Sequence, residues 1–153
     1  MPDLVTHVLV AFLFVKLRKL ERYTSLIYLG ALMPDMSRLG VFAMGTTSSW
    51  FFMPLHTPLG ILLSALFITY FFDEKNRKPV FTNLMIGAIL HLFPDLIQIH
   101  WGTEYYVFYP FSWEKFEIGL FWPEQSIYFI PVLLLGATII TLLESRKKPD
   151  PSE

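Results

Sequence analysis

Long apolar runs, separated by short clusters of charge, dominate this sequence. A helix that crosses the hydrocarbon core of a bilayer needs about 20 apolar residues, with a range of roughly 17–25. Residues 55–72, 80–99 and 126–143 form runs of that length, whereas the runs at residues 4–17 and 23–35 are shorter. The pattern predicts an all-α integral membrane helical bundle of about five hydrophobic segments, two of them short.

Composition supports the membrane interpretation and excludes several other classes. Hydrophobic residues make up 54% of the 153 residues, which is too high for a disordered chain. The 12 Lys+Arg and 13 Asp+Glu leave a net charge of -1, so we expect membrane lipid and no nucleic acid among its partners. The absence of cysteine excludes disulfides and thiolate metal sites. We expect a single integral membrane domain over residues 1–145 and a polar cytoplasmic tail over residues 146–153.

The basic residues predict how the bundle lies in the membrane. Ten of the 12 Lys and Arg residues fall in three clusters, at residues 16–22, 75–78 and 146–148. Cytoplasmic loops carry an excess of Lys and Arg, and all three clusters are cytoplasmic if the N-terminus lies outside and the chain crosses five times. The sequence therefore predicts a multi-pass protein of the inner, cytoplasmic membrane of the cell.

In that orientation residues 101–122 form an extracytoplasmic loop. Ten of these 22 residues are aromatic, and Trp and Tyr favour the headgroup layer of a bilayer. We expect this loop to anchor on the outer membrane surface.

Five ionisable residues stand within the apolar runs, where such groups are costly and mark functional sites by default. Counted from the cytoplasmic end of each run at about 1.5 Å per residue, they lie at heights of roughly 13–26 Å in a core about 30 Å thick. They come from four different segments, yet they share the middle-to-outer layer of the membrane. We expect them to converge on one site, which faces the extracytoplasmic side and comprises His7, Asp35, His56, His91 and Asp95.

Helical spacing gives these side chains a direction. His91 and Asp95 are four residues apart and share a helix face, which Gln98 joins seven residues after His91. Gly87 and Ala88 lie on that face one turn earlier, and small residues let helices approach closely in a membrane.

Two further ionisable residues lie outside this set. His100 falls about half a turn off the His91 face if the helix continues that far. Asp3 is four residues before His7, and it serves equally well as a helix cap.

Three imidazoles and two carboxylates at one depth suit a divalent metal. Imidazole and carboxylate ligands suit zinc first. Manganese, iron and nickel stay open as alternatives, because a ligand set without sulfur does not distinguish among these metals. The five groups can hold one ion with a spare carboxylate as general base, or two ions about 3.5–4 Å apart. The open alternative is a non-catalytic protein: an ion pathway, or a structural or partner-binding subunit whose polar groups form a helix-junction network.

Short motifs in a fixed order resemble the YdjM-like (DUF457) family of membrane-bound metal-dependent hydrolases. The resemblance covers roughly residues 3–113 and rests on Thr6-His7, Gly30-Ala31-Leu32-Met33-Pro34-Asp35, His56-Thr57, His91-Leu92-Phe93-Pro94-Asp95 and Tyr109-Pro110-Phe111-Ser112. That family is distantly similar to zinc-dependent phospholipase C and P1-type nucleases. Two family features are missing: no His-Arg pair precedes His56, and Ser37 stands where a second acidic residue is frequent.

The resemblance implies that the five residues named above are metal ligands. It also implies a metal-dependent hydrolase, with Asp35 and Asp95 in catalytic roles and a phosphoester of a lipid or lipid-linked molecule as substrate. It implies nothing about the oligomeric state.

Overall fold

The computed structural model describes residues 4–44, 53–100 and 105–146, with backbone alone for residues 37–44. These parts are helical apart from their loops, and an isolated β-bridge joins Gln98 to Phe121. The prediction of an all-α fold is confirmed. The elements are α1 (Leu4–Arg18), η1 (Glu21–Tyr23), α2 (Thr24–Met44), η3 (Met53–His56), α4 (Pro58–Tyr70), α5 (Glu74–Ile97), η4 (Pro123–Tyr128) and α6 (Phe129–Ser145).

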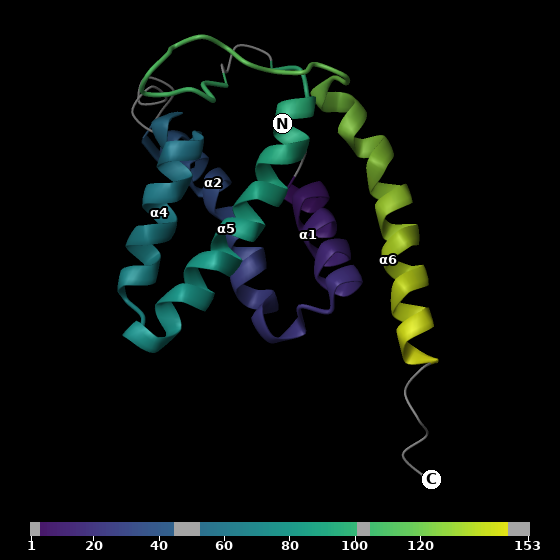
Figure 1. The fold of residues 1–153 in the computed structure, drawn as a ribbon. Coiled ribbons are helices and arrows are strands. Elements are labelled where there is room, and N and C mark those ends of the chain that lie inside the picture. The colour runs from purple at the N-terminus through teal and green to yellow at the C-terminus, as the bar shows by residue number, and fades with distance from the viewer. Residues whose placement is uncertain (1–3, 45–52, 101–104, 147–153) are drawn as a thin grey trace.

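The helices run alternately up and down, and α5 crosses the middle of the bundle (Figure 1). It packs against α1, α2 and α4, whereas α6 lies beside α1. The end of α1, the turn between α4 and α5, and the end of α6 all lie at one end of the molecule (Figure 1). The basic clusters at residues 16–22 and 75–78 and Arg146 of the third cluster adjoin these positions, so the bundle has a basic end. The loop between α5 and α6 lies at the opposite end.

Helix lengths differ from the predicted runs in two places. The prediction that the second run stops at Pro34-Asp35 was wrong, because α2 continues to Met44 with Pro34 inside it. A proline removes one backbone donor, and helices of membrane proteins tolerate this loss where neighbouring groups compensate. At 21 residues α2 is about 32 Å long, enough to cross a bilayer core.

The third run is shorter than its apolar composition predicted. Its α-helix, α4, has 13 residues and begins only at Pro58, because Thr57 caps it. The Thr57 hydroxyl accepts a hydrogen bond from the Gly60 amide at 3.2 Å. Within the described residues, two helical stretches have the length and apolarity of a membrane span: α5 and the combined Pro123–Ser145.

Close contact between α2 and α5 depends on two glycines. A Cβ atom on Gly30 would collide with the backbone carbonyl of Leu84, and one on Gly87 would collide with the carbonyl of Ile27. The predicted role of Gly87 in helix approach is therefore confirmed. The backbones of α2 and α5 are so close at Gly30 and Gly87 that neither position has room for a side chain. The buried face of α5 therefore lies directly against α2.

The distribution of apolar side chains is that of a protein surrounded by lipid. On α6, Val132 is 68% exposed and Leu135 is 62% exposed, while Ala137 is buried. On α5 the large Phe93 side chain is 65% exposed, whereas Gly87, Ala88, His91 and Asp95 are buried. At these positions bulky apolar groups face outward and small or polar groups face inward, as expected where the solvent is hydrocarbon.

Substituting Gly87 with alanine should destabilise the bundle by about 1–3 kcal/mol or more, because the new methyl group must push the α2 and α5 backbones apart. Thermal unfolding of the detergent-solubilised protein measures the effect. Gly136→Ala is the matched control, since a Cβ there meets only the Leu13 side chain, at an ordinary 3.7 Å. Equal melting temperatures for the two variants would contradict the proposed close packing.

Candidate metal centre

The five predicted residues lie together in the structure, although they come from four separate elements. His7 is in the first turn of α1, Asp35 in the middle of α2, and His56 at the end of η3. His91 and Asp95 occupy the last two turns of α5. The predicted convergence is therefore observed, while the role of these residues as metal ligands stays a prediction.

Asp95 lies at the centre of the cluster, and three imidazole nitrogens surround its carboxylate. Its Oδ2 is 2.9 Å from His56 Nε2 and 3.2 Å from His91 Nε2, and its Oδ1 is 3.3 Å from His7 Nε2. Asp95, His7 and His91 are fully buried. One carboxylate thus faces three imidazole nitrogens in a region shielded from water.

Backbone carbonyls of α2 orient two of these rings. His91 Nδ1 lies 2.7 Å from the carbonyl oxygen of Ala31, and His56 Nδ1 lies 3.1 Å from that of Pro34. A carbonyl oxygen can only accept, so each Nδ1 carries the proton and donates it. In a neutral ring Nε2 then keeps its lone pair, and in both residues this atom faces Asp95.

Lone pairs on nitrogen and carboxylate oxygen repel one another at about 3 Å, so the arrangement needs a cation between them. A proton on the Asp95 carboxyl would give a donor to only one of the three imidazoles, and protons on the imidazoles would place charged groups in an apolar interior at a large cost. A divalent metal meets the same need with neutral rings, and a metal-bound histidine commonly donates its other N–H to a backbone carbonyl. In the described part of the chain, His91 Nε2 and both ring nitrogens of His7 have no hydrogen-bond partner. The residues present therefore fit a metal.

Two overlapping sets of donors meet the spacing of a metal site. Within each set the donor atoms lie within 4.8 Å of one another, and His91 belongs to both: His7, Asp35 and His91, and His56, His91 and Asp95. Each offers two imidazole nitrogens and one carboxylate oxygen, which matches the three-ligand set of catalytic zinc sites.

Ring stacking fixes the imidazoles further. The His7 and His91 rings are stacked, with centroids 3.9 Å apart and an angle of 17° between planes. His56 meets the His91 ring edge-on at 5.2 Å. The donor atoms are thus held before any ion binds, which is the condition for a preorganised site.

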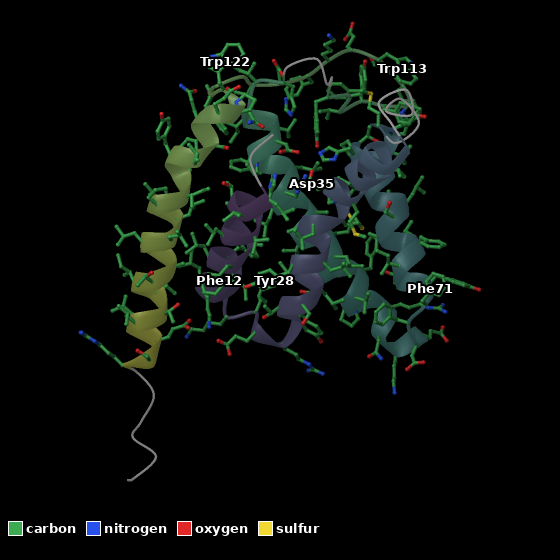
Figure 2. All side chains as sticks on the ribbon, turned by 180° about the vertical axis from the view of Figure 1, so that it is seen from behind. Phe12, Tyr28, Asp35, Phe71, Trp113 and Trp122 are labelled. Atoms are coloured by element: carbon green, nitrogen blue, oxygen red, sulfur yellow. The ribbon has the colours of Figure 1, made fainter. Side chains whose placement is uncertain are left out.

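Among the described residues, Asp35 and His56 are the members of the cluster that keep exposed surface. The Asp35 side chain is 16% exposed and that of His56 is 11% exposed, whereas the other three members have no exposed surface. Figure 2 shows Asp35 among the helices, on the side of the bundle that faces the loop carrying Trp113. Access to the cluster therefore runs past Asp35 and His56.

The remaining predicted residues lie outside the cluster. The α-helix ends at Ile97, so His100 does not continue the His91 face; its Nδ1 lies 3.1 Å from Glu117 Oε2. Burial lowers the pKa of the His100 imidazole, and the Glu117 carboxylate opposes this shift only in part. Gln98 is fully buried on the predicted face, one turn beyond Asp95. Asp3 lies outside the described residues.

Sequence reasoning missed Tyr105 as part of this region. Its side chain is buried, and its ring lies edge-on to His56 at 5.6 Å and stacks on His100 at 5.4 Å. It stands in a loop with nine other aromatic residues, so spacing offered no signal that distinguishes it from membrane-anchoring neighbours. It covers His56 on the open side of the cluster.

Comparisons with known proteins identify the family. No curated protein and no solved structure matches the chain, so its predicted likeness to phospholipase C and P1-type nucleases stays a prediction. A family model described as YdjM inner membrane protein matches residues 1–150, nearly the whole chain. The convergent His/Asp cluster thus lies in a protein that belongs to the YdjM inner membrane protein family.

Proposed function

We propose that this protein is a membrane-embedded, metal-dependent hydrolase that cleaves a phosphoester of a lipid or lipid-linked substrate. The observation that carries the proposal is the orientation of His56 and His91. Both rings donate Nδ1–H to α2 carbonyls, so both present Nε2 to buried carboxylate oxygens. This arrangement supports a metal centre better than a hydrogen-bonded helix junction, which would pair each ring nitrogen with a donor or an acceptor.

Four residues of the cluster, His7, His56, His91 and Asp95, would hold one or two ions, with zinc the first choice and manganese or iron as alternatives. A bound divalent metal lowers the pKa of a coordinated water toward neutrality and offsets negative charge on a phosphoryl oxygen. The chain itself supplies the orientation, because stacking and carbonyl contacts hold the imidazoles in place.

The two carboxylates differ in ways that suggest separate roles. Asp95 is fully buried and touches three imidazoles, so we assign it the role of ligand. Asp35 lies 3.9 Å from His91 Nε2 and is partly exposed on the open side of the cluster. A carboxylate in that position can reach an incoming water or substrate, so we assign Asp35 the role of general base.

The packing beneath the cluster argues against an ion pathway. Toward the basic end the interior is an apolar core that α2, α4 and α5 share, formed by Met33, Ile61, Ala65, Val80, Leu84 and Ala88. A pathway would need polar lining or water on both sides of the cluster. A cluster with exposed surface at Asp35 and His56 and an apolar core beneath it fits a substrate site better.

We further propose that the chain crosses the membrane five times with the metal centre in the outer half. Three basic clusters at one end of the bundle support this orientation, as does an aromatic loop at the other (Figure 2 labels Trp113 and Trp122 there). A lipid substrate would then reach Asp35 from the outer leaflet, beneath the aromatic loop.

Elemental analysis of the purified protein tests the metal centre. We expect about one or two equivalents of zinc, manganese or iron in the wild type, and roughly tenfold less or lower still in Asp95→Asn. That substitution keeps the shape of the side chain but removes the negative charge of the carboxylate that the three imidazoles face. His100→Gln is the control, since His100 lies outside the cluster and should leave metal content unchanged. A wild type without metal after reconstitution would overturn the hydrolase proposal.

Hydrolysis assays separate the roles of the two carboxylates. Asp35→Asn should retain the metal yet lower kcat by about 10²–10⁴-fold, because it removes the base and not a buried ligand. Asp95→Asn should lose both metal and activity. Release of phosphate or headgroup from a panel of lipid phosphoesters provides the measurement. Full activity in Asp35→Asn would exclude that residue as the base.

Single-cysteine labelling tests the orientation, since the natural chain contains no cysteine. Glu114→Cys, in the aromatic loop, should react with a membrane-impermeant maleimide in intact spheroplasts. Lys75→Cys, in the first turn of α5, should react only after the membrane is permeabilised. Both wild-type side chains are exposed, so the reagent can reach both positions from the appropriate side. The reverse pattern would invert the topology.

A further inference from the structure

A groove at the basic end of the bundle lies between α4 and α5, far along both helices from the metal centre. It has a volume of about 330 Å³ and is lined by Leu66, Thr69, Tyr70, Arg77, Lys78 and Phe81. Figure 2 labels Phe71, the neighbour of Tyr70, at the end of the molecule opposite Trp113. The groove is therefore separate from the site proposed above.

The cationic side of the groove is held in position by its own contacts. Arg77 donates from Nε to the carbonyl oxygen of Phe72 at 3.1 Å, and its guanidinium carbon lies 5.5 Å from the centroid of the Tyr70 ring. Lys78 adds a second positive charge, and no acidic residue is among the described residues that line the groove. Two cations without a lining carboxylate favour an anionic ligand.

Thr69 supplies an independent sign of a ligand. Its side chain is only 6% exposed, and its hydroxyl has no hydrogen-bond partner among the described residues. A buried hydroxyl without a partner carries a free-energy cost, which a ligand oxygen in the groove would remove. The groove therefore offers a hydroxyl donor as well as two cations.

The rest of the lining is apolar and continues onto the lipid-facing surface. Leu66 is 48% exposed and Tyr70 is 71% exposed, and Phe81 is half-buried between them and the core. A free inorganic anion would gain nothing from these side chains. A molecule with a phosphate at one end and an acyl chain at the other would contact all six lining residues.

We propose that this groove binds one anionic phospholipid of the leaflet at the basic end. The phosphate diester lies against Arg77 and Lys78 and accepts a hydrogen bond from Thr69, and an acyl chain lies along Leu66, Tyr70 and Phe81. A net negative headgroup such as that of phosphatidylglycerol is favoured over a zwitterionic one, whose ammonium group the two cations repel. Basic pockets between helices at the cytoplasmic side of membrane proteins bind anionic headgroups by the same chemistry.

Native mass spectrometry of the full-length protein in detergent tests the proposal, with added phosphatidylglycerol as probe and phosphatidylcholine as reference. We expect the wild type to retain one phosphatidylglycerol, and Arg77→Gln/Lys78→Gln to bind it about tenfold more weakly or worse. The matched control is Arg18→Gln/Lys19→Gln, which removes the same charge from exposed residues at the same end, outside the groove. The control should bind as the wild type does.

Equal loss of binding in both double variants would overturn the proposal, since surface charge alone would then account for retention. Equal retention of phosphatidylcholine would overturn it as well. So would inorganic phosphate that raises the melting temperature as much as phosphatidylglycerol does, because the ligand would then be a free anion. Thr69→Val, which replaces the hydroxyl with a methyl group, should weaken binding a few-fold, while the melting temperature without lipid should stay the same or rise because an unpartnered buried hydroxyl is removed. None of these outcomes depends on metal binding or hydrolysis.

Discussion

An ionised carboxylate buried among hydrocarbon side chains is costly unless positive charge or hydrogen-bond donors offset it, and the structure of this protein is arranged around that requirement. Asp95 has no exposed surface and lies within 3.3 Å of nitrogens from three histidines. Those histidines belong to α1, η3 and α5, so one ionic centre joins elements from the first turn of α1 to the end of α5. The free energy of a charge in an apolar medium makes any looser arrangement costly. The same requirement is what makes the centre suited to a divalent cation.

The precision of the centre comes from the contact between α2 and α5. Gly30 and Gly87 let the two backbones touch, which places α2 carbonyls within reach of side chains from α5 and η3. Pro34 lacks an amide hydrogen, so the α2 hydrogen-bond ladder is interrupted next to these carbonyls. The backbone of α2 thereby decides which imidazole nitrogen carries the proton. Small residues are thus as important to the chemistry as the histidines themselves.

The two ends of the bundle have different chemistry, and the proposed orientation of the protein in the membrane rests on this difference. The aromatic loop and Asp35 lie toward one end, and the turn between α4 and α5, beside the groove lined by Arg77 and Lys78, lies toward the other (Figures 1 and 2). Lys16 ties this second end together, since its Nζ lies 2.9 Å from Glu144 of α6 and 3.2 Å from Glu21. If an anionic lipid occupies the groove and a lipid substrate reaches Asp35, each leaflet contributes a different ligand to one small protein.

The sequence by itself determined the all-α class, the number of hydrophobic segments and the membership of the His/Asp cluster, because apolar length and the cost of buried charge act locally along the chain. It also placed Gly87 at a helix contact. It did not determine that α2 continues through Pro34, since the groups that compensate a lost backbone donor come from neighbouring elements. Nor did it show that α4 starts only at Pro58 or that Tyr105 covers His56. Only the tertiary structure decided which carbonyls orient His56 and His91, because those contacts join residues 22 and 60 positions apart. No local pattern encodes such distances, and they exist only once α2 and α5 have packed.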